Sequence, residues 1–271
     1  MKPWVIKIGG AALANPASIH ELVKTVVHLK QMGEDVVVVH GGGPMINKKL
    51  VEKNIQWSFF EGQRITTQEM IDCIAEGLSE VNEHLTSALE AARITTMGLR
   101  GNLESIFISR PMNESLGLVG EVMNVQTAKI QQALDAGMVP VIAPMGLDEM
   151  GQIYNINADW GAAKLSVALE AKNLLFCTDQ RGILDLNKLP YDSLTLTQLR
   201  ILMKKEGVTG GMLAKARTIE FALTHQVEKV IVLHAQELCE LVIDRNICGT
   251  FCVSMSRIEY INKMQELSHA Y

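Results

Sequence analysis

Four consecutive valines at positions 36–39 run directly into His40, three glycines and Pro44. An uninterrupted β-branched run of this length is typical of a strand that is covered on both faces. Pro44 suits the first turn of a helix, where its missing N–H would have no partner in any case. The segment therefore predicts a buried strand, a glycine turn and a helix in immediate succession, which is the unit from which α/β folds are built.

Short apolar runs and longer amphipathic stretches alternate along the rest of the chain. Strands are expected at residues 5–8, 36–39, 94–99, 105–109, 139–142, 152–156, 174–177 and 230–233. Helices are expected at residues 18–32, after Pro44, and at 67–92, 127–136, 158–171, 196–206 and 212–225. This alternation predicts an α/β protein, a three-layer αβα sandwich with a mainly parallel central sheet.

Two segments depart from the alternation. Residues 56–65, centred on Glu61 and Gly62, predict a β-hairpin, and residues 146–151 predict a turn. No linker rich in proline, glycine and serine divides the chain. We therefore expect one domain over residues 1–271 with one continuous sheet, and two functional lobes that meet near residue 170.

Charge and composition exclude several classes of protein. The net charge of −5 and the scattered lysines and arginines disfavour a nucleic-acid-binding face. No stretch reaches roughly 18 consecutive apolar residues, the length of a membrane span, and the first residues lack a signal-peptide pattern. The five cysteines lack metal-ligand spacing, so we expect reduced, buried thiols, no protein-bound metal and a cytoplasmic enzyme.

Glycine turns follow two of the expected strands. Lys7 lies inside the first strand, where a buried cation needs a partner, and Gly9 and Gly10 come directly after that strand. Glycines 41–43 precede a helix N-terminus, where backbone N–H groups converge on an anion. Because carboxyl ends of parallel strands share one edge of a sheet, both turns are expected at one ligand-binding edge. His40 is either a base or a structural residue, and Lys7 alone also fits a side chain that reaches solvent.

Three further polar clusters would complete such a site. Arg64 follows the hairpin glycine, and an arginine can bind a carboxylate through two hydrogen bonds. Asn155 and Asp159 lie at a strand end and a helix start, and Thr209 precedes two glycines and a helix that carries Lys215. Taken singly, Arg64 also fits a solvated surface residue, Asp159 a helix-start acid and Lys215 an exposed helix lysine.

Together these segments resemble the N-acetylglutamate kinases of the amino acid kinase family. The resemblance covers residues 4 to about 253, and its clusters follow the family's order at about its spacing. The matching stretches are Lys7–Gly10, Val39–Pro44, Glu61–Thr66, Val139–Pro144, Tyr154–Asp159, Thr178–Leu184 and Thr209–Lys215.

The resemblance implies ATP-dependent phosphorylation of the γ-carboxylate of N-acetyl-L-glutamate to an acyl phosphate, in arginine and ornithine biosynthesis. Lys7 and Lys215 would stabilise the transferring phosphoryl group, and Asp159 would hold both lysines. The residues that would bind phosphate are Gly10 and Gly41, and those that would bind the acceptor are Gly42, Gly43, Arg64 and Asn155. ATP, arriving with Mg²⁺, would lie near Asp179, Gly182, Leu184, Thr209 and Gly211.

These residue types suit the reaction. A carboxylate acceptor is already ionised at neutral pH, so no general base is required. The obstacle is repulsion between the anionic acceptor and the γ-phosphate, which two lysines and converging N–H groups would counter.

The resemblance also implies an organisation. Residues up to about 170 would form an N-terminal lobe for acceptor binding and dimerisation, and residues from about 171 a nucleotide-binding lobe. Arginine-inhibited members of the family carry a helix ahead of the first strand. Here that strand is expected to begin by about Trp4, so a homodimer insensitive to arginine is implied.

The chain departs from the family pattern at Arg100–Glu104, near the acceptor lobe, at Lys164 within a usually apolar helix, and at Arg181. Residues 254–271 run past the family's usual end. In that tail, apolar residues at 258, 261 and 264 would fit a short amphipathic helix.

Two alternatives stay open. The first is a kinase of the same fold that acts on an aminoadipate derivative. The second is a catalytically inactive member that serves as a binding or regulatory subunit. The inactive member would be expected to lack a lysine or the aspartate, whereas Lys7, Asp159 and Lys215 are all present.

Overall fold

The computed structural model describes residues 2–60, 62–185, 187–205, 207–243 and 248–255. Within these residues the central sheet has eight strands, which run in the order β12 (Ser193–Thr195), β14 (Thr250–Val253), β13 (Lys229–His234), β11 (Asn173–Thr178), β1 (Trp4–Ile8), β2 (Val36–His40), β8 (Val139–Ala143) and β5 (Thr96–Arg100). Neighbouring strands are parallel except β13 and β14. The predicted mainly parallel sheet is confirmed.

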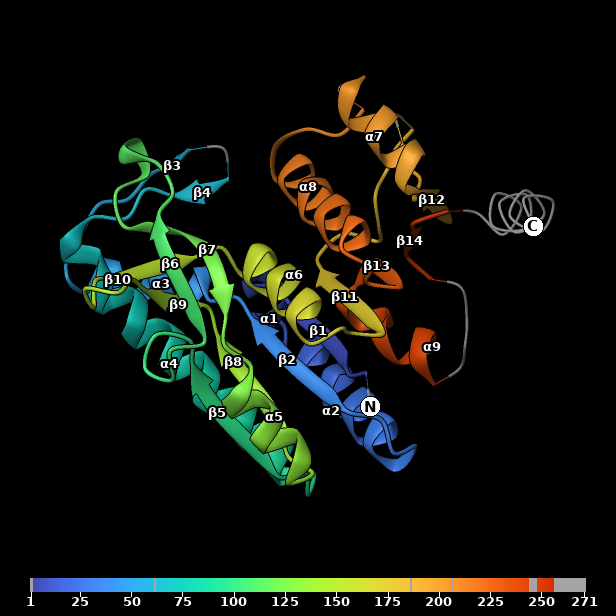
Figure 1. Ribbon diagram of the computed structural model, residues 1–271, viewed down its shortest axis with the longest axis horizontal. Coiled ribbons are helices and arrows are strands. Elements are labelled where there is room, and N and C mark those ends of the chain that lie inside the picture. The colour runs from blue at the N-terminus through green and yellow to red at the C-terminus, as the bar shows by residue number, and fades with distance from the viewer. Residues whose placement is uncertain (1, 61, 186, 206, 244–247, 256–271) are drawn as a thin grey trace, which may run out of the picture.

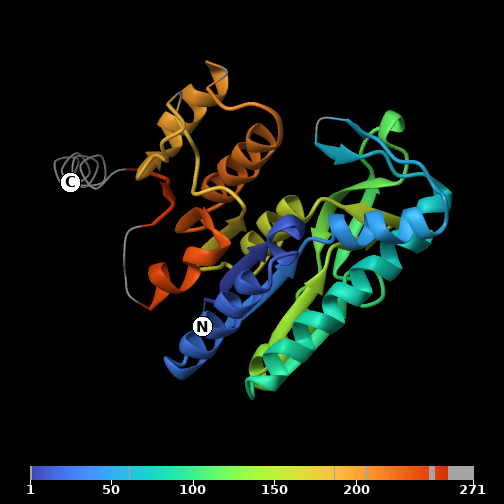
Figure 2. The same cartoon turned by 180° about the vertical axis from the view of Figure 1, so that it is seen from behind.

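Helices cover both faces of this sheet, as Figures 1 and 2 show from opposite sides. One face carries α1 (Gly10–Leu13), α2 (Pro16–Gln31), α4 (Gln68–Ala91) and α9 (Leu238–Val242). The other carries α5 (Ala128–Asp135), α6 (Ala158–Ala168), α7 (Leu196–Lys204) and α8 (Gly210–Thr224). A further helix, α3 (Gly43–Glu52), packs on α4. The three-layer sandwich is therefore confirmed.

Alternating side chains of each strand supply the two cores. In β1, Val5 packs on the face of α6 and α8, whereas Ile6 and Ile8 pack on the face of α2, and all three are fully buried. Lys7 shares the face of Val5, because successive residues of a strand point to opposite sides. The strand period therefore directs Lys7 towards α6 and α8.

The prediction of one continuous sheet is wrong. Besides the central sheet, the described residues form a closed barrel of β6 (Phe107–Pro111), β7 (Val119–Val125), β9 (Met145–Leu147) and β10 (Ile153–Ile156), and a separate hairpin of β3 (Phe59–Phe60) and β4 (Gln63–Arg64). Gly146, expected in a turn, lies within β9. A side chain there would collide with the hydroxyl of Ser109, so the glycine permits close strand packing rather than a turn. The turn itself spans 148–151.

The other expected strands and helices are present to within a few residues. The helix expected to reach residue 171 ends at Ala168, and Glu170 has a positive φ of 50°. Strands β7, β9, β12 and β14 and helices α1 and α9 were not predicted. The expected amphipathic helix in the tail lies outside the described residues, as do Glu61 and Glu206.

Two predictions from composition can be compared with the structure. All five cysteines are free, and all are buried except Cys248, which is half-buried. None of the helices in the described ranges is long and apolar enough to cross a membrane.

Candidate active site

The two predicted glycine turns touch each other at the carboxyl ends of β1 and β2. A Cβ atom on Gly10 would lie 2.7 Å from the backbone nitrogen of Gly43, and one on Gly41 would lie 2.7 Å from the nitrogen of Gly10. Only glycine allows backbones to approach this closely. The space around a Cβ on Gly43 is open, and helix α3 begins at this residue. The backbone groups of both turns and the N-terminus of α3 thus lie together at one point on the sheet edge.

An aspartate lies between two lysines beside these turns. Nζ of Lys7 is 2.7 Å from Oδ1 of Asp159, and Nζ of Lys215 is 2.7 Å from Oδ2. The three side chains come from β1, α6 and α8 and are 10, 17 and 9% exposed. A Cβ on Gly9 would lie 3.7 Å from Nζ of Lys7, so the cluster borders the glycine turn. The alternative of an exposed helix lysine at 215 is wrong, because Lys215 is buried.

Local structure fixes the position of Asp159. The side chain of Asn157 caps helix α6 and accepts hydrogen bonds from the backbone N–H groups of Asp159 and Trp160 at 2.9 and 3.3 Å. Asp159 therefore stands in the first turn of α6, on the face of the sheet to which Lys7 points. Nζ of Lys215 also lies 4.7 Å from the centre of the Phe176 ring, where the ring face attracts its positive charge.

Burial and charge act against each other within the cluster. Burial would raise the pKa of Asp159, but the charges of Lys215 and Lys7 outweigh burial and hold that pKa well below its usual range. Burial also lowers the pKa of Lys215, and Asp159 opposes that effect. One carboxylate thus shares two cations, which leaves the cluster with a net charge of about +1 and suits it to an incoming anion.

Arg64 lies in a separate, buried setting next to the glycine turns. It is 6% exposed, and its guanidinium lies 4.8 Å from the ring of Phe59 and 5.7 Å from that of Trp57. Nη2 donates to Oδ1 of Asn47 at 2.5 Å, while Nη1 is buried without a hydrogen-bond partner among the described residues. Burial lowers the pKa of Arg64. The alternative of a solvated surface arginine is wrong, because the side chain is buried and its guanidinium lies against the rings of Trp57 and Phe59.

Arg64 and the glycine turns line one cavity of about 510 Å³. Gly10, Gly41, Gly42 and Gly43 border it from the sheet edge, and Asn155 borders it from the barrel. The amide of Asn155 donates to Oγ1 of Thr66 at 3.1 Å, and that hydroxyl donates to the carbonyl of Arg64 at 2.9 Å. The chain of bonds ties the barrel to the hairpin and fixes the wall of the cavity.

Three polar residues of this region were not predicted. Asn47 lies four residues after Gly43 on α3, a helical spacing that could have placed both on one face. Thr66 and Asn82 gave no comparable signal, because their partners are distant in sequence.

His40 has a structural setting. It is fully buried, its Nδ1 lies 3.0 Å from the carbonyl oxygen of Gly41, and its Nε2 lies 3.0 Å from the amide nitrogen of Asn82. Asn82 in turn donates to the carbonyl of Val141 at 2.8 Å. Burial lowers the pKa of His40 to about 4, against the smaller opposite effect of the Gly41 hydrogen bond. A neutral imidazole with both nitrogens engaged supports the glycine turn and is not placed to act as a base.

The residues expected around the nucleotide have fewer side-chain contacts. Asp179 is exposed and accepts a hydrogen bond from Thr178, and Leu184 pairs with Pro190. Thr209 and Gly211 are exposed at the start of α8, where a Cβ on Gly211 would meet nothing within 4 Å. Gly211 precedes Lys215 by one helical turn and so shares its face of the helix.

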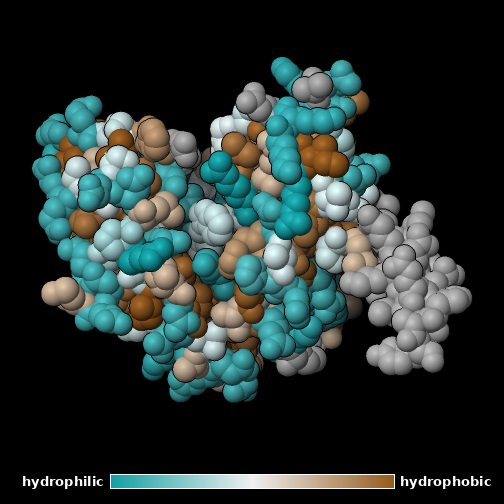
Figure 3. All heavy atoms as spheres, turned by 45° about the horizontal axis from the view of Figure 1, so that its top comes forward, coloured by the Kyte–Doolittle hydropathy of each residue, from teal (hydrophilic) through white to brown (hydrophobic). Residues whose placement is uncertain are grey.

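Gly182 differs from the other residues expected around the nucleotide. It is buried with a φ of +152°, and a Cβ atom there would lie 2.5 Å from Oγ1 of Thr250. The atoms that a side chain at this position would meet therefore belong to Thr250 of β14 and to Pro190. Figure 3 shows a notch between the two halves of the molecule, seen with the top of Figure 1 turned forward.

Comparisons with known proteins agree with this architecture. An acetylglutamate kinase from Nitratidesulfovibrio vulgaris is 37% identical over 267 residues, which cover 92% of this chain and 86% of that protein. A Streptococcus mutans crystal structure has a TM-score of 0.82 at 24% identity, covering 93% of this chain and 98% of that one. An N-acetylglutamate synthase from Neisseria gonorrhoeae has a TM-score of 0.83 at 20% identity, covering 94% and 60%. At such identities the two structures show the fold alone.

A family model also matches most of the chain. The model described as the amino acid kinase family matches residues 2–234, which hold the glycine turns, Arg64 and the cluster of Lys7, Asp159 and Lys215. The chain therefore belongs to the amino acid kinase family.

Proposed function

We propose that this protein is a kinase that uses ATP to phosphorylate the γ-carboxylate of N-acetyl-L-glutamate, a step of arginine and ornithine biosynthesis in the cytoplasm. The observation that carries the proposal is the buried cluster of Lys7, Asp159 and Lys215 beside the joined glycine turns. The curated relative that is 37% identical bears the name acetylglutamate kinase, which supports the choice of acceptor.

The acceptor would lie in the cavity that Arg64 and Asn155 line. Its α-carboxylate would pair with the guanidinium of Arg64 and give a partner to Nη1, which has none among the described residues. Asn155 would donate to the same end of the acceptor. The γ-carboxylate would then point towards Gly42 and Gly43, at the N-terminus of α3.

In the reaction, a γ-carboxylate oxygen attacks the γ-phosphorus of ATP. The new O–P bond forms as the bond from phosphorus to the bridging oxygen breaks, and ADP leaves with that oxygen. Lys7 and Lys215 stabilise the charge on the transferring group, while Asp159 keeps both ammonium groups in place. Gly10 and Gly41 bring backbone groups close to that charge.

The nucleotide would lie over Asp179, Leu184, Thr209 and Gly211, near the start of α8, with Gly182 shaping its loop. Mg²⁺ would arrive with ATP and neutralise phosphate charge. Mg²⁺ usually keeps several waters and is held partly by substrate phosphates, so the ion would be bound mainly through ATP. Among the described residues, no group of three histidine, cysteine or acidic side chains is placed to hold a metal ion. Residues up to about 170 would thus serve the acceptor, and later residues the nucleotide.

We propose a homodimer as the working assembly. Strand β5 is an edge of the central sheet within the described residues, and it leaves backbone groups for a further strand. Pairing of two β5 strands would continue the sheet across two copies. Light scattering should give twice the mass of the chain, and a monomer mass would contradict this assembly.

The acceptor is tested with purified protein, ATP and Mg²⁺ in a coupled ADP-release assay. The panel contains N-acetyl-L-glutamate, N-acetyl-L-aspartate and N-acetyl-L-2-aminoadipate. Hydroxylamine in a parallel reaction traps an acyl phosphate as a hydroxamate. The proposal predicts hydroxamate with N-acetyl-L-glutamate at the highest kcat/KM. Preference for the aminoadipate derivative would identify a kinase for the longer acceptor, and no ADP release with any acceptor would indicate an inactive binding member.

A further inference from the structure

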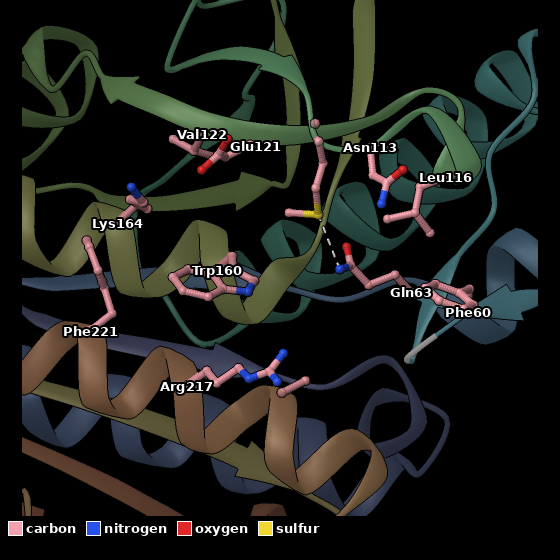
Figure 4. Close-up of a pocket in the computed structure, with 13 residues that line it drawn as sticks. Phe60, Gln63, Asn113, Leu116, Glu121, Val122, Trp160, Lys164, Arg217 and Phe221 are labelled. Carbon is pink, nitrogen blue, oxygen red and sulfur yellow. Dashed lines mark hydrogen bonds between the residues drawn. The ribbon is translucent and has the colours of Figure 1, made fainter. Parts of the chain in front are cut away.

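A second cavity of about 470 Å³ lies between the two halves of the molecule, outside the candidate active site (Figure 4). Trp160 and Lys164 reach it from α6, Arg217 and Phe221 from α8, and Val122 from β7. A volume of this size suits a small ligand. None of the glycines of the two turns lines this cavity, and neither does Arg64.

The floor of this cavity is aromatic. Trp160 and Phe221 meet edge to face with ring centroids 5.7 Å apart, and Nζ of Lys164 lies 4.6 Å from the Phe221 ring. Such a surface favours a flat apolar group, which can stack on or beside the two rings.

The charges around the cavity favour an anion. Within the described part of the chain, neither Lys164 nor Arg217 has a carboxylate within ion-pair distance, although both line the cavity. The carboxylate that lines it, Glu121, is already bound by Arg110 at 2.8 Å. Two cations that lack a carboxylate partner among the described residues, next to an aromatic floor, form a recognition surface for an amphipathic anion. Lys164 is also the residue that departs from the apolar pattern expected in its helix, and this cavity gives it a role.

The hairpin separates this cavity from the acceptor cavity. Phe60 lines the second cavity and Phe59 lines the acceptor cavity, while Gln63 borders both. The amide of Gln63 lies 3.2 Å from the sulfur of Met112, which holds the hairpin against the barrel strand β6 and its following loop. Occupants of the two cavities can therefore be present together, one on each side of the hairpin.

We propose that this second cavity is a binding site for a small aromatic carboxylate, held by Lys164 and Arg217 over Trp160 and Phe221. The ligand contacts α6 and α8 together with the barrel strand β7. It binds independently of the nucleotide and the acceptor, so the site goes beyond the proposed phosphoryl transfer.

The test uses 2-naphthoate and its neutral analogue 2-naphthamide, whose binding to the full chain is measured by isothermal titration calorimetry. The expected result is one bound 2-naphthoate per chain, with affinity about tenfold above that for 2-naphthamide, because charge-assisted contacts act on the carboxylate alone. The double variant Lys164→Gln, Arg217→Gln should lose this preference. The control Lys129→Gln, an exposed lysine on α5, should keep it.

Competition locates the probe. Saturating N-acetyl-L-glutamate should leave the stoichiometry of 2-naphthoate binding unchanged. Equal affinities for the acid and the amide, unchanged preference in the double variant, or complete displacement by N-acetyl-L-glutamate would each overturn the proposal. Because binding is measured directly, a protein that phosphorylates another acceptor still gives a decisive result.

Discussion

The two sides of the candidate active site are built differently. On the proposed acceptor and phosphoryl side, Lys7, Arg64 and Lys215 are buried and held by other side chains. On the nucleotide side, Thr209 and Gly211 are exposed, and Gly211 has open space around it. The comparison indicates that the fold preorganises the charged groups, whereas the residues proposed to bind the nucleotide are open to solvent. Substitutions should therefore cost most on the buried side.

The largest effect is expected at Lys7. Replacing Lys7 by alanine removes one of the two cations that we propose stabilise the transferring phosphoryl group, so kcat should fall by about 10²–10³, the scale for loss of one preorganised donor. The acceptor KM should change much less. Lys7→Arg should not restore kcat, because a planar guanidinium cannot replace a compact ammonium beside Asp159. Steady-state kinetics of both variants gives kcat and the acceptor KM. A Lys7→Arg variant with wild-type kcat would contradict the need for a compact ammonium group on the buried side.

The pH dependence of the free energy of unfolding tests the burial of His40. Its pKa is about 4 in the folded protein and about 6.5 when unfolded. Between these values the unfolded chain takes up a proton that the folded protein does not, so stability falls as pH drops from 6.5 to 4. The free energy of unfolding should decrease by about 3 kcal/mol over this range.

Urea unfolding at several pH values measures this slope. His40→Gln should remove the contribution of His40 to the fall in the free energy of unfolding between pH 6.5 and 4. His28→Gln on α2 should leave that contribution in place. Equal slopes in His40→Gln and the wild type would show that His40 does not control acid stability.

Arg64 tests the acceptor cavity. Arg64→Ala should raise the acceptor KM by an amount equivalent to about 1.5–3 kcal/mol, because a hydrogen-bonded charged partner is lost. The KM for ATP should stay nearly unchanged, since Arg64 lines the cavity proposed for the acceptor. Asn47→Ala is the companion variant, and it should have a smaller effect because it only orients the guanidinium. Equal changes for both substrates would contradict the assignment.

Much of the fold could be predicted because buried strands and helices have patterns of apolar residues that are visible in a short stretch of sequence. The valine run of β2 and the period of α2 are visible in a few residues. Strand β7 was missed because Gly120, Glu121 and Asn124 interrupt its apolar pattern. A small closed barrel needs such residues at close contacts and on its outer surface.

The site was only partly predictable for a related reason. Glycine turns are local, so their place at one sheet edge followed from the strand pattern. The burial of Arg64 and Lys215 depends on Trp57, Phe59 and Asp159, which single-residue reasoning could not bring near them. The resemblance to a family supplied the pairing of Lys7 with Lys215 through Asp159.

The smallest effects are expected on the nucleotide side, where two glycines can be compared. Gly211→Ala should leave stability within about 0.5 kcal/mol or raise it slightly, because the site is open and helical. Only the KM for ATP should rise. Gly182→Ala should instead destabilise the fold by about 1–3 kcal/mol, because its φ is +152° and Thr250 fills the space. Thermal unfolding measures the stability of both variants, and titration with ATP measures the KM for ATP. Equal destabilisation by Gly211→Ala and Gly182→Ala would contradict the predicted difference between the two glycines.

The central claim is that Lys215, held by Asp159, stabilises the phosphoryl group during transfer. Its most direct measurement is the single-turnover rate constant for acyl phosphate formation, with protein in excess over ATP and acceptor saturating. Lys215→Ala should reduce this rate constant by about 10²–10³ relative to the wild type. A control, Lys129→Ala on α5, should match the wild type. A rate constant for Lys215→Ala within about threefold of the wild type, equivalent to less than about 0.7 kcal/mol, would contradict the account.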